Sequence, residues 1–145
     1  MSDTGTRSCP RGSSPSTCLN GPVDVEITTI GGSTYAVVTG TQDDGVSIID
    51  ISTPASPVYV SELEDGTDTG KCTAANGERC LDQTYGVAIA TIGDSTYVVA
   101  VGYRDNGIAI IDISTPASPV YVSQLEDEEP PGTNIRKCSA ANGDS

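Results

Sequence analysis

The sequence predicts an all-β protein made of two tandem four-stranded antiparallel, blade-like repeats, and two observations support this fold class. First, Ile48–Ser61 reads IIDISTPASPVYVS, and Ile110–Ser123 repeats it letter for letter at an offset of 62 residues. At this offset, about two-thirds of the positions in 19–65 and 81–127 are identical. Second, β-branched segments alternate with turn signals, and no stretch has a sustained period of 3.6 residues. Almost no helix is therefore expected.

The repeat divides the 145 residues into five segments. A cysteine-containing lead-in, 1–18, precedes the first repeat, 19–65. A cysteine-containing connector, 66–80, separates it from the second repeat, 81–127. The remaining segment, 128–145, begins like a third connector. The length therefore predicts two repeat units with overhanging ends rather than one conventional domain.

Each repeat contains four predicted strands, separated by recognisable turns. Gly93-Asp94-Ser95 and Asn106-Gly107 are short hairpin signals. Pro116 presets φ and removes a backbone donor in the turn before the last strand. The predicted strands of the first repeat are Val23–Ile30, Thr34–Gly40, Gly45–Ser52 and Pro57–Leu63, and those of the second are Tyr85–Ile92, Thr96–Tyr103, Gly107–Ser114 and Pro119–Leu125.

Several strands are nearly continuous apolar runs rather than alternating ones, namely Ala36–Val38, Val98–Val101 and Ile108–Ile111. A sheet with one solvated face alternates between apolar and polar residues, so both faces of these strands are expected to be buried. Propeller blades or a stacked β-repeat array bury both faces against neighbouring units. Because a propeller needs four to eight blades, two units are expected to belong to a longer array or to associate with further copies.

The segments Gly45–Val60 (GVSIIDISTPASPVYV) and Gly107–Val122 (GIAIIDISTPASPVYV) resemble the LVIVD repeat. This family occurs in bacterial and archaeal surface or secreted proteins, and its repeats are understood as β-propeller blades. The resemblance covers both units but not the cysteine-bearing connectors, which lengthen the period. It implies a fold and an extracellular or cell-surface location, and it implies no single activity.

Four cysteines flank two polar loops, each directly before the first strand of a repeat. Cys9 and Cys18 enclose one loop, and Cys72 and Cys80 enclose the other. The favoured interpretation is two local disulfides, Cys9–Cys18 and Cys72–Cys80, which would imply an oxidising compartment. Metal or redox chemistry is disfavoured because the chain has no C-x-x-C pair and no His. Reduced thiols or another pairing stay open.

The fifth cysteine, Cys138, has no partner within its own loop copy, because Lys137–Gly143 repeats Lys71–Gly77 and the partner would fall just past Ser145. Two hypotheses remain for it. Either a longer array contains its partner, or Cys138 bonds to a neighbouring chain in a self-assembling subunit. Gel mobility with and without reductant tests the second hypothesis.

Acidic turns occupy the same place in both repeats. Asp43, Asp44, Asp105 and Asn106 precede a glycine and are interpreted mainly as hairpin turns that tolerate a positive φ. The alternative is a weak calcium site, because Ca²⁺ prefers carboxylate oxygens. The pattern lacks the D-x-D-x-D-G series and distal Glu of an EF-hand, so no cofactor is expected apart from this calcium alternative.

Asp50 and Asp112 interrupt apolar strands, one in each repeat. A buried carboxylate needs hydrogen bonds, and the hydroxyls and amides of Ser52–Ser56 and Ser114–Ser118 can supply them. Both residues are therefore predicted to brace a turn, and a paired-carboxylate catalytic role is disfavoured because catalytic residues rarely recur once per repeat. The repeated Tyr59 and Tyr121 are expected to pack between units.

Composition narrows the function further. Twenty acidic against seven basic side chains give a net charge of −13, which argues against nucleic acid and anionic membranes as partners. No apolar run approaches the ~20 residues of a membrane span, so no membrane insertion is expected. The absence of His excludes His-dependent triads.

We therefore expect no catalysis, and we expect a structural or interaction protein whose repeats stack on neighbouring repeats or on other copies of the chain, in a filament or a ring. The alternative is a ligand-binding, calcium-linked propeller segment of a cell-surface protein.

Overall fold

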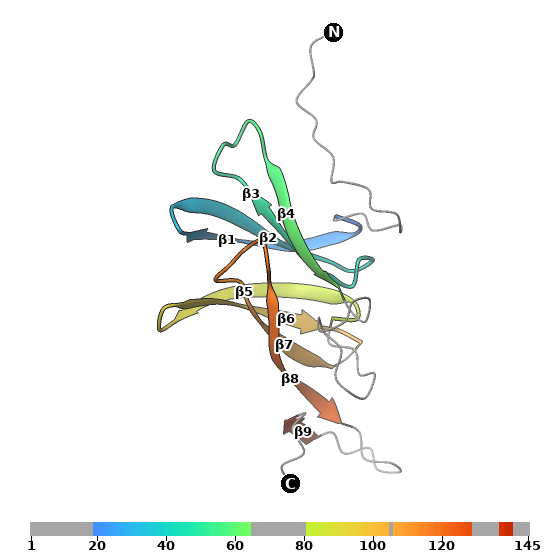
Figure 1. Cartoon of the computed structure of the whole chain (residues 1–145). Helices are drawn as coiled ribbons and strands as arrows, with labels where there is room; N and C mark the ends of the chain where they lie inside the picture. Colours follow the sequence, from blue (N-terminus) through green and yellow to red (C-terminus); the bar gives the residue numbers. More distant parts are fainter. Residues whose placement is uncertain (1–18, 65–80, 105, 129–136, 141–145) are drawn as a thin grey trace.

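The structure is a computed structural model that describes residues 19–64, 81–104, 106–128 and 137–140, and within these ranges it contains nine strands and no helix. The strands form two antiparallel sheets that lie one above the other (Figure 1). The first sheet has the order β1-β2-β3-β4, with bounds Pro22–Ile30, Ser33–Gly40, Gly45–Asp50 and Val58–Glu64. The second has the order β5-β6-β7-β8-β9, with bounds Thr84–Ile92, Ser95–Gly102, Gly107–Asp112, Val120–Glu128 and Lys137–Ala140. The prediction of an all-β fold with two antiparallel repeat sheets is confirmed.

The two sheets have the same strand register. Val37 pairs with Ile48, and Ile48 pairs with Ser61; Val99 and Ile110, 62 residues later, are paired in the same way. Both sheets also have a register shift near the start of their first strand and another between their third and fourth strands. The repeat in the sequence is therefore a repeat of backbone geometry down to its irregularities.

The turn before the third strand depends on two special backbone conformations. Asp44 and Asn106 have φ of 48° and 51°, the left-handed region that Asp and Asn tolerate better than other side chains. In the first repeat Gly45 follows, and a Cβ at this position would lie only 2.5 Å from the Leu63 carbonyl oxygen. β3 can therefore approach β4 this closely only with glycine at its first position.

The core lies between the two sheets rather than within either of them. It combines buried residues of the first repeat with a larger set from the second: Val37, Val46, Ile48, Leu63, Leu81, Val87, Val98, Ala100, Ala109, Ile111 and Ile113. The sheets contact each other mainly where β1 and β2 meet β5. Each sheet buries one face in this core, since strand residues that pair across a sheet share a face.

Several details differ from the sequence-based expectations. β3 and β7 end at Asp50 and Asp112, two residues before the predicted ends, and β9 adds a fifth strand to the second sheet beside β8. The apolar runs were expected to be buried on both faces, but Val101 is 44% exposed. That expectation is wrong for the described chain because two stacked sheets share one interface, so each sheet retains one uncovered face.

Candidate functional site

The interface between the repeats contains hydrogen bonds as well as apolar side chains. Thr39, which is fully buried in β2, donates its hydroxyl to the Tyr85 carbonyl oxygen at 2.9 Å. Ser61 in β4 donates its hydroxyl to the Pro116 carbonyl oxygen at 2.5 Å. Each bond joins a side chain of the first repeat to a loop or strand backbone of the second. Such bonds fix the register of the contact, which apolar packing alone does not do.

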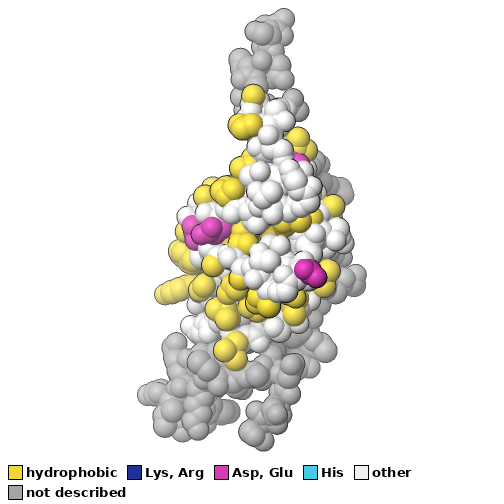
Figure 2. Space-filling view, turned by 90° about the vertical axis from the view of Figure 1, so that its left-hand side faces the viewer, with side chains coloured by type: hydrophobic (Ala, Val, Ile, Leu, Met, Phe, Trp, Pro, Cys, Tyr) yellow, Lys and Arg dark blue, Asp and Glu magenta, His cyan; other side chains and the backbone are white. Residues whose placement is uncertain are grey.

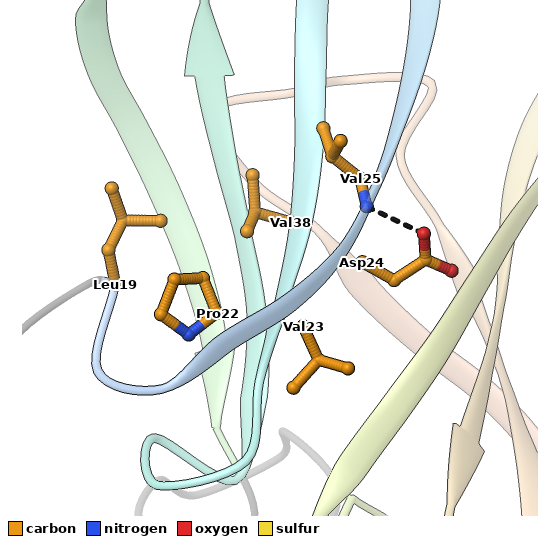
Figure 3. A pocket seen from close by; sticks show the side chains of 6 residues that line it. All are labelled: Leu19, Pro22, Val23, Asp24, Val25 and Val38. Atoms are coloured by element: carbon orange, nitrogen blue, oxygen red, sulfur yellow. Dashed lines mark hydrogen bonds between the residues drawn. The ribbon is translucent and has the colours of Figure 1, made fainter.

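Asp24 connects the first strands of the two repeats. Its Oδ1 accepts the amide of Val25 at 2.9 Å, and its Oδ2 accepts the amide of Val87 at 3.0 Å. Val25 and Val87 occupy the same position in the two repeats, so one carboxylate bonds to equivalent amides of both. Figure 3 shows the Asp24 side chain pointing from β1 toward the strand of the second sheet. Asp24 therefore acts as a clamp between the repeats.

The turn residue Asp44 makes a further bond between the repeats, because its Oδ1 accepts the Gln83 amide at 2.9 Å. Its neighbour Asp43 accepts the Asn20 amide at 2.6 Å. Asn106 occupies the equivalent turn of the second repeat, and Asp105 lies outside the described residues. No group of three or more His, Cys, Asp or Glu suited to a metal is found in the described part of the chain. The calcium hypothesis stays a prediction.

Each sheet has an outer face on which no described strand packs, and these two faces lie at opposite ends of the two-sheet stack. The outer face of the first sheet, which we call the head face, includes the exposed Val25 and Ile27, the half-buried Val38, Ile49 and Tyr59, and the buried Ala36 and Ser47. The outer face of the second sheet, which we call the tail face, consists of Gly86, Val99, Val101, Ile108, Ile110, Ser123 and Leu125. Figure 2 views the stack from the side and shows patches of hydrophobic side chains at the surface, with few acidic side chains among them.

Exposure differs sharply between equivalent positions of the two repeats. On the head face Val25 is 52% exposed, whereas its equivalent Val87 is 7% exposed inside the interface. At the other end, Leu125 of the tail face is 39% exposed, whereas its equivalent Leu63 is 1% exposed. The head face is thus the repeat equivalent of the buried face of the second sheet. By the same offset, the tail face is the equivalent of the buried face of the first.

An open apolar pocket of about 450 Å³ lies at the edge of the head face (Figure 3). It is lined by Leu19, Pro22, Val23, Asp24, Val25 and Val38. The equivalent residue of Leu19 in the second repeat is Leu81, which is 0% exposed and belongs to the core. The pocket in the first repeat therefore corresponds to the region around Leu81 in the second repeat, which is buried in the interface between the sheets.

Asp50 and Asp112 make the same corner in both repeats. Each accepts the amide two residues ahead, Ser52 or Ser114, at 2.8 Å. The serine hydroxyl in turn accepts a β-strand amide, and it holds the pKa of Asp50 and of Asp112 below the ordinary 3.8, with the serine amide contributing next. Both carboxylates are half-buried at the end of a strand rather than enclosed in it.

The repeated tyrosines have different surroundings. Tyr121 packs against the core between the sheets, and its hydroxyl donates to Gln124 Oε1 at 2.9 Å. Tyr59 lies on the head face, where partial burial and then the nearby Glu62 and Glu64 raise its pKa to about 12. Glu62 and Gln124 are equivalent positions, so the neutral amide stands on the buried face and the carboxylate on the uncovered one.

Of the five predicted cysteine sites, Cys138 alone lies in the described part of the chain. Cys9, Cys18, Cys72 and Cys80 all lie outside the described residues. Cys138 lies in β9, opposite Asp127 of β8. The disulfide predictions therefore stay predictions.

Sequence reasoning did not single out Asp24 and Thr39, and it interpreted Asp44 as a turn residue or calcium ligand rather than as a residue that joins the repeats. One signal could have found them. Within an alignment that is about two-thirds identical, Asp24 is replaced by Gly86 and Thr39 by Val101. When a strand position is polar in just one of the two repeats, that position has an environment that the two repeats do not share.

Two stacked antiparallel sheets, folded from tandem sequences that are about two-thirds identical and joined face to face, define a blade-type β-repeat protein. The LVIVD repeat model matches residues 34–65 and 87–127, half of the chain, and the chain belongs to this family. No curated protein and no solved structure matches the chain. The described part of the chain contains no helix with the length and hydropathy to cross a membrane.

Proposed function

We propose that the chain is a non-enzymatic structural or interaction protein, extracellular or at a cell surface, whose LVIVD repeats act by stacking on like repeats. The stacking partner is a neighbouring repeat of a longer chain or another copy. One observation carries this proposal: both uncovered faces are equivalents of faces that pack against each other between the two repeats.

The chemistry of the described residues supports a role without catalysis. The carboxylates that recur in both repeats, Asp50 and Asp112, bond to the turn that follows them. The Asp24 and Asp44 carboxylates bond to backbone amides across the interface. These groups stabilise turns and contacts between strands, and none of them is arranged around a common reacting atom.

The mass of the native particle tests the proposal. Light scattering coupled to size exclusion, over a wide range of protein concentration, should give masses above the 14.8 kDa of one chain. Running the samples with and without reductant separates non-covalent stacking from disulfide bonding between chains. A chain that remains a monomer at millimolar concentration under both conditions would contradict stacking between copies.

A further inference from the structure

We propose that the tail face of one copy docks onto the head face of a second copy, in the register that the two repeats use inside one chain. This inference rests on the proposed function and specifies its contact. Because the two faces belong to different sheets, the contact is heterologous, that is, head to tail. The occupant of the head face is thus the second sheet of another copy.

The apolar part of this contact follows from the offset of 62 residues. Inside the chain, Val46 and Leu63 of the first repeat are 3% and 1% exposed in the core that also contains Leu81. The residues equivalent to Val46 and Leu63 on the tail face are Ile108 and Leu125. The docked tail face therefore places Ile108 and Leu125 over the head-face pocket.

Of the four polar contacts described above between the repeats, two can recur between copies. Ser123 is equivalent to Ser61, so its hydroxyl is placed to donate to the Pro54 carbonyl oxygen of the second copy, as Ser61 donates to Pro116. Asn106 is equivalent to Asp44, and its amide oxygen can accept the Gly21 amide as Asp44 accepts that of Gln83. These two bonds would set the same register.

The other two polar contacts are absent from the tail face. Thr39 is replaced by Val101, and Asp24 is replaced by Gly86. The second loss leaves no amide unpaired on the head face, because the Val25 amide is already bonded to Asp24 Oδ1 within its own chain. The contact between copies is thus more apolar than the contact between repeats and has fewer bonds, so it should be reversible where the internal one is permanent.

The net charge of −13 should make the association between copies depend on salt concentration. Two copies repel each other at low ionic strength, and salt screens this repulsion while leaving apolar contact intact. Association through these faces should therefore strengthen as salt rises from about 20 mM to about 500 mM, the opposite of what a contact held by ion pairs shows.

A complementation experiment tests the assigned faces. Val25→Glu places a charge on the head face, and Val101→Glu places one on the tail face, where the native side chains are 52% and 44% exposed. Each variant alone should associate at least ~10-fold more weakly than the wild type, because docking would bury the new charge. Mixed together, the two variants should form a 1:1 heterodimer, since the mixture retains one intact head face and one intact tail face.

Val120→Glu is the matched control. Val120 is 56% exposed and its equivalent Val58 is 52% exposed, so this position stays uncovered even in the repeat whose inner face is packed. Its association should equal that of the wild type. Circular dichroism checks the folding of every variant, and reductant in all samples removes any covalent link through Cys138.

The outcomes separate the two proposals. A wild type that stays monomeric at every concentration and salt contradicts stacking between copies altogether. A wild type that associates, together with single variants that associate equally well or a mixture that forms no heterodimer, overturns the assigned faces and leaves the proposed function standing.

Discussion

The two repeats differ more in their surroundings than in their sequences. Their strands pair in the same register, and the corner around Asp50 is reproduced around Asp112. Equivalent side chains nevertheless differ in solvent exposure, since Leu19 is 41% exposed and Leu81 is 0% exposed. Burial in this molecule is therefore decided by which neighbour a face has, and a repeat alone does not determine it.

The sequence differences follow the same division. Ala36 and Val38 of the first repeat become Val98 and Ala100 in the second, which exchanges large and small side chains along one strand face and conserves the total volume. The polar bonds from Asp24 and Thr39, in contrast, are present only where the first repeat meets the second. Both repeats thus have the same total side-chain volume on this strand face, whereas the hydrogen bonds of Asp24 and Thr39 occur only at the contact between the two repeats.

The largest effect should come from removing the same leucine in the two repeats. Leu81→Ala leaves a cavity in the core and should lower the free energy of unfolding by about 3 kcal/mol. Leu19→Ala, at the equivalent exposed position, should cost less than about 1 kcal/mol. Urea unfolding of both variants in dilute solution measures the difference. Equal losses would mean that the two repeats do not differ in their packing.

Breaking the clamp between the repeats should have the next largest effect. Asp24→Ala removes the acceptor of the Val87 amide and should cost about 1–2 kcal/mol. Hydrogen exchange at Val87 should accelerate, whereas exchange in the strands far from the interface should change little.

Gly86→Ala is the control for the clamp, at the position equivalent to Asp24. A Cβ there meets only side-chain atoms at 3.7 Å or beyond, so the change should shift stability by less than about 1 kcal/mol. If Asp24→Ala were as harmless as this control, the two bonds of its carboxylate would contribute no net stability.

A pair of exchanges tests whether the internal contact depends on one hydroxyl. Thr39→Val gives the first repeat the residue of the second and leaves the Tyr85 carbonyl oxygen without its 2.9 Å bond, at a cost of about 1 kcal/mol. The reverse change, Val101→Thr, lies on the exposed tail face and should stay within about 0.5 kcal/mol. Thermal unfolding of both variants gives the comparison, and a stable Thr39→Val protein would contradict it.

Most of the fold was predictable because repetition exposes it. The identical segments Ile48–Ser61 and Ile110–Ser123 reveal the unit, and the Asn106-Gly107 signal places a hairpin that the structure confirms. The ends of β3 and β7 were less predictable. Each strand stops where an aspartate takes the amide two residues ahead out of the ladder, and this depends on a side-chain bond rather than on hydrophobic pattern.

The sequence could predict that the candidate site is a stacking surface, but not which face of each repeat forms it. Nearly continuous apolar runs indicated stacking, but pattern alone cannot say which face of a repeat is covered, because both repeats have nearly the same pattern. Val25 and Val87 are both valines, and only the arrangement of the sheets exposes one and buries the other. The clamp by Asp24 depends likewise on how the second sheet lies against β1, which no local signal specifies.

The smallest difference between the repeats should appear at their shared corner. The serine hydroxyl and then the serine amide lower the pKa of Asp50 and Asp112, so each charged carboxylate is favoured by folding. This stabilisation is fully present above the ordinary pKa of 3.8 and is lost as the pH falls through the lowered values of the folded state. Carboxyl NMR titration should place both transitions below 3.8, and Asp50→Asn and Asp112→Asn should reduce acid sensitivity equally. If the two substitutions reduced acid sensitivity unequally, the contact between the sheets would be affecting one of these turns. The matching hydrogen bonds of the two repeats argue against that result.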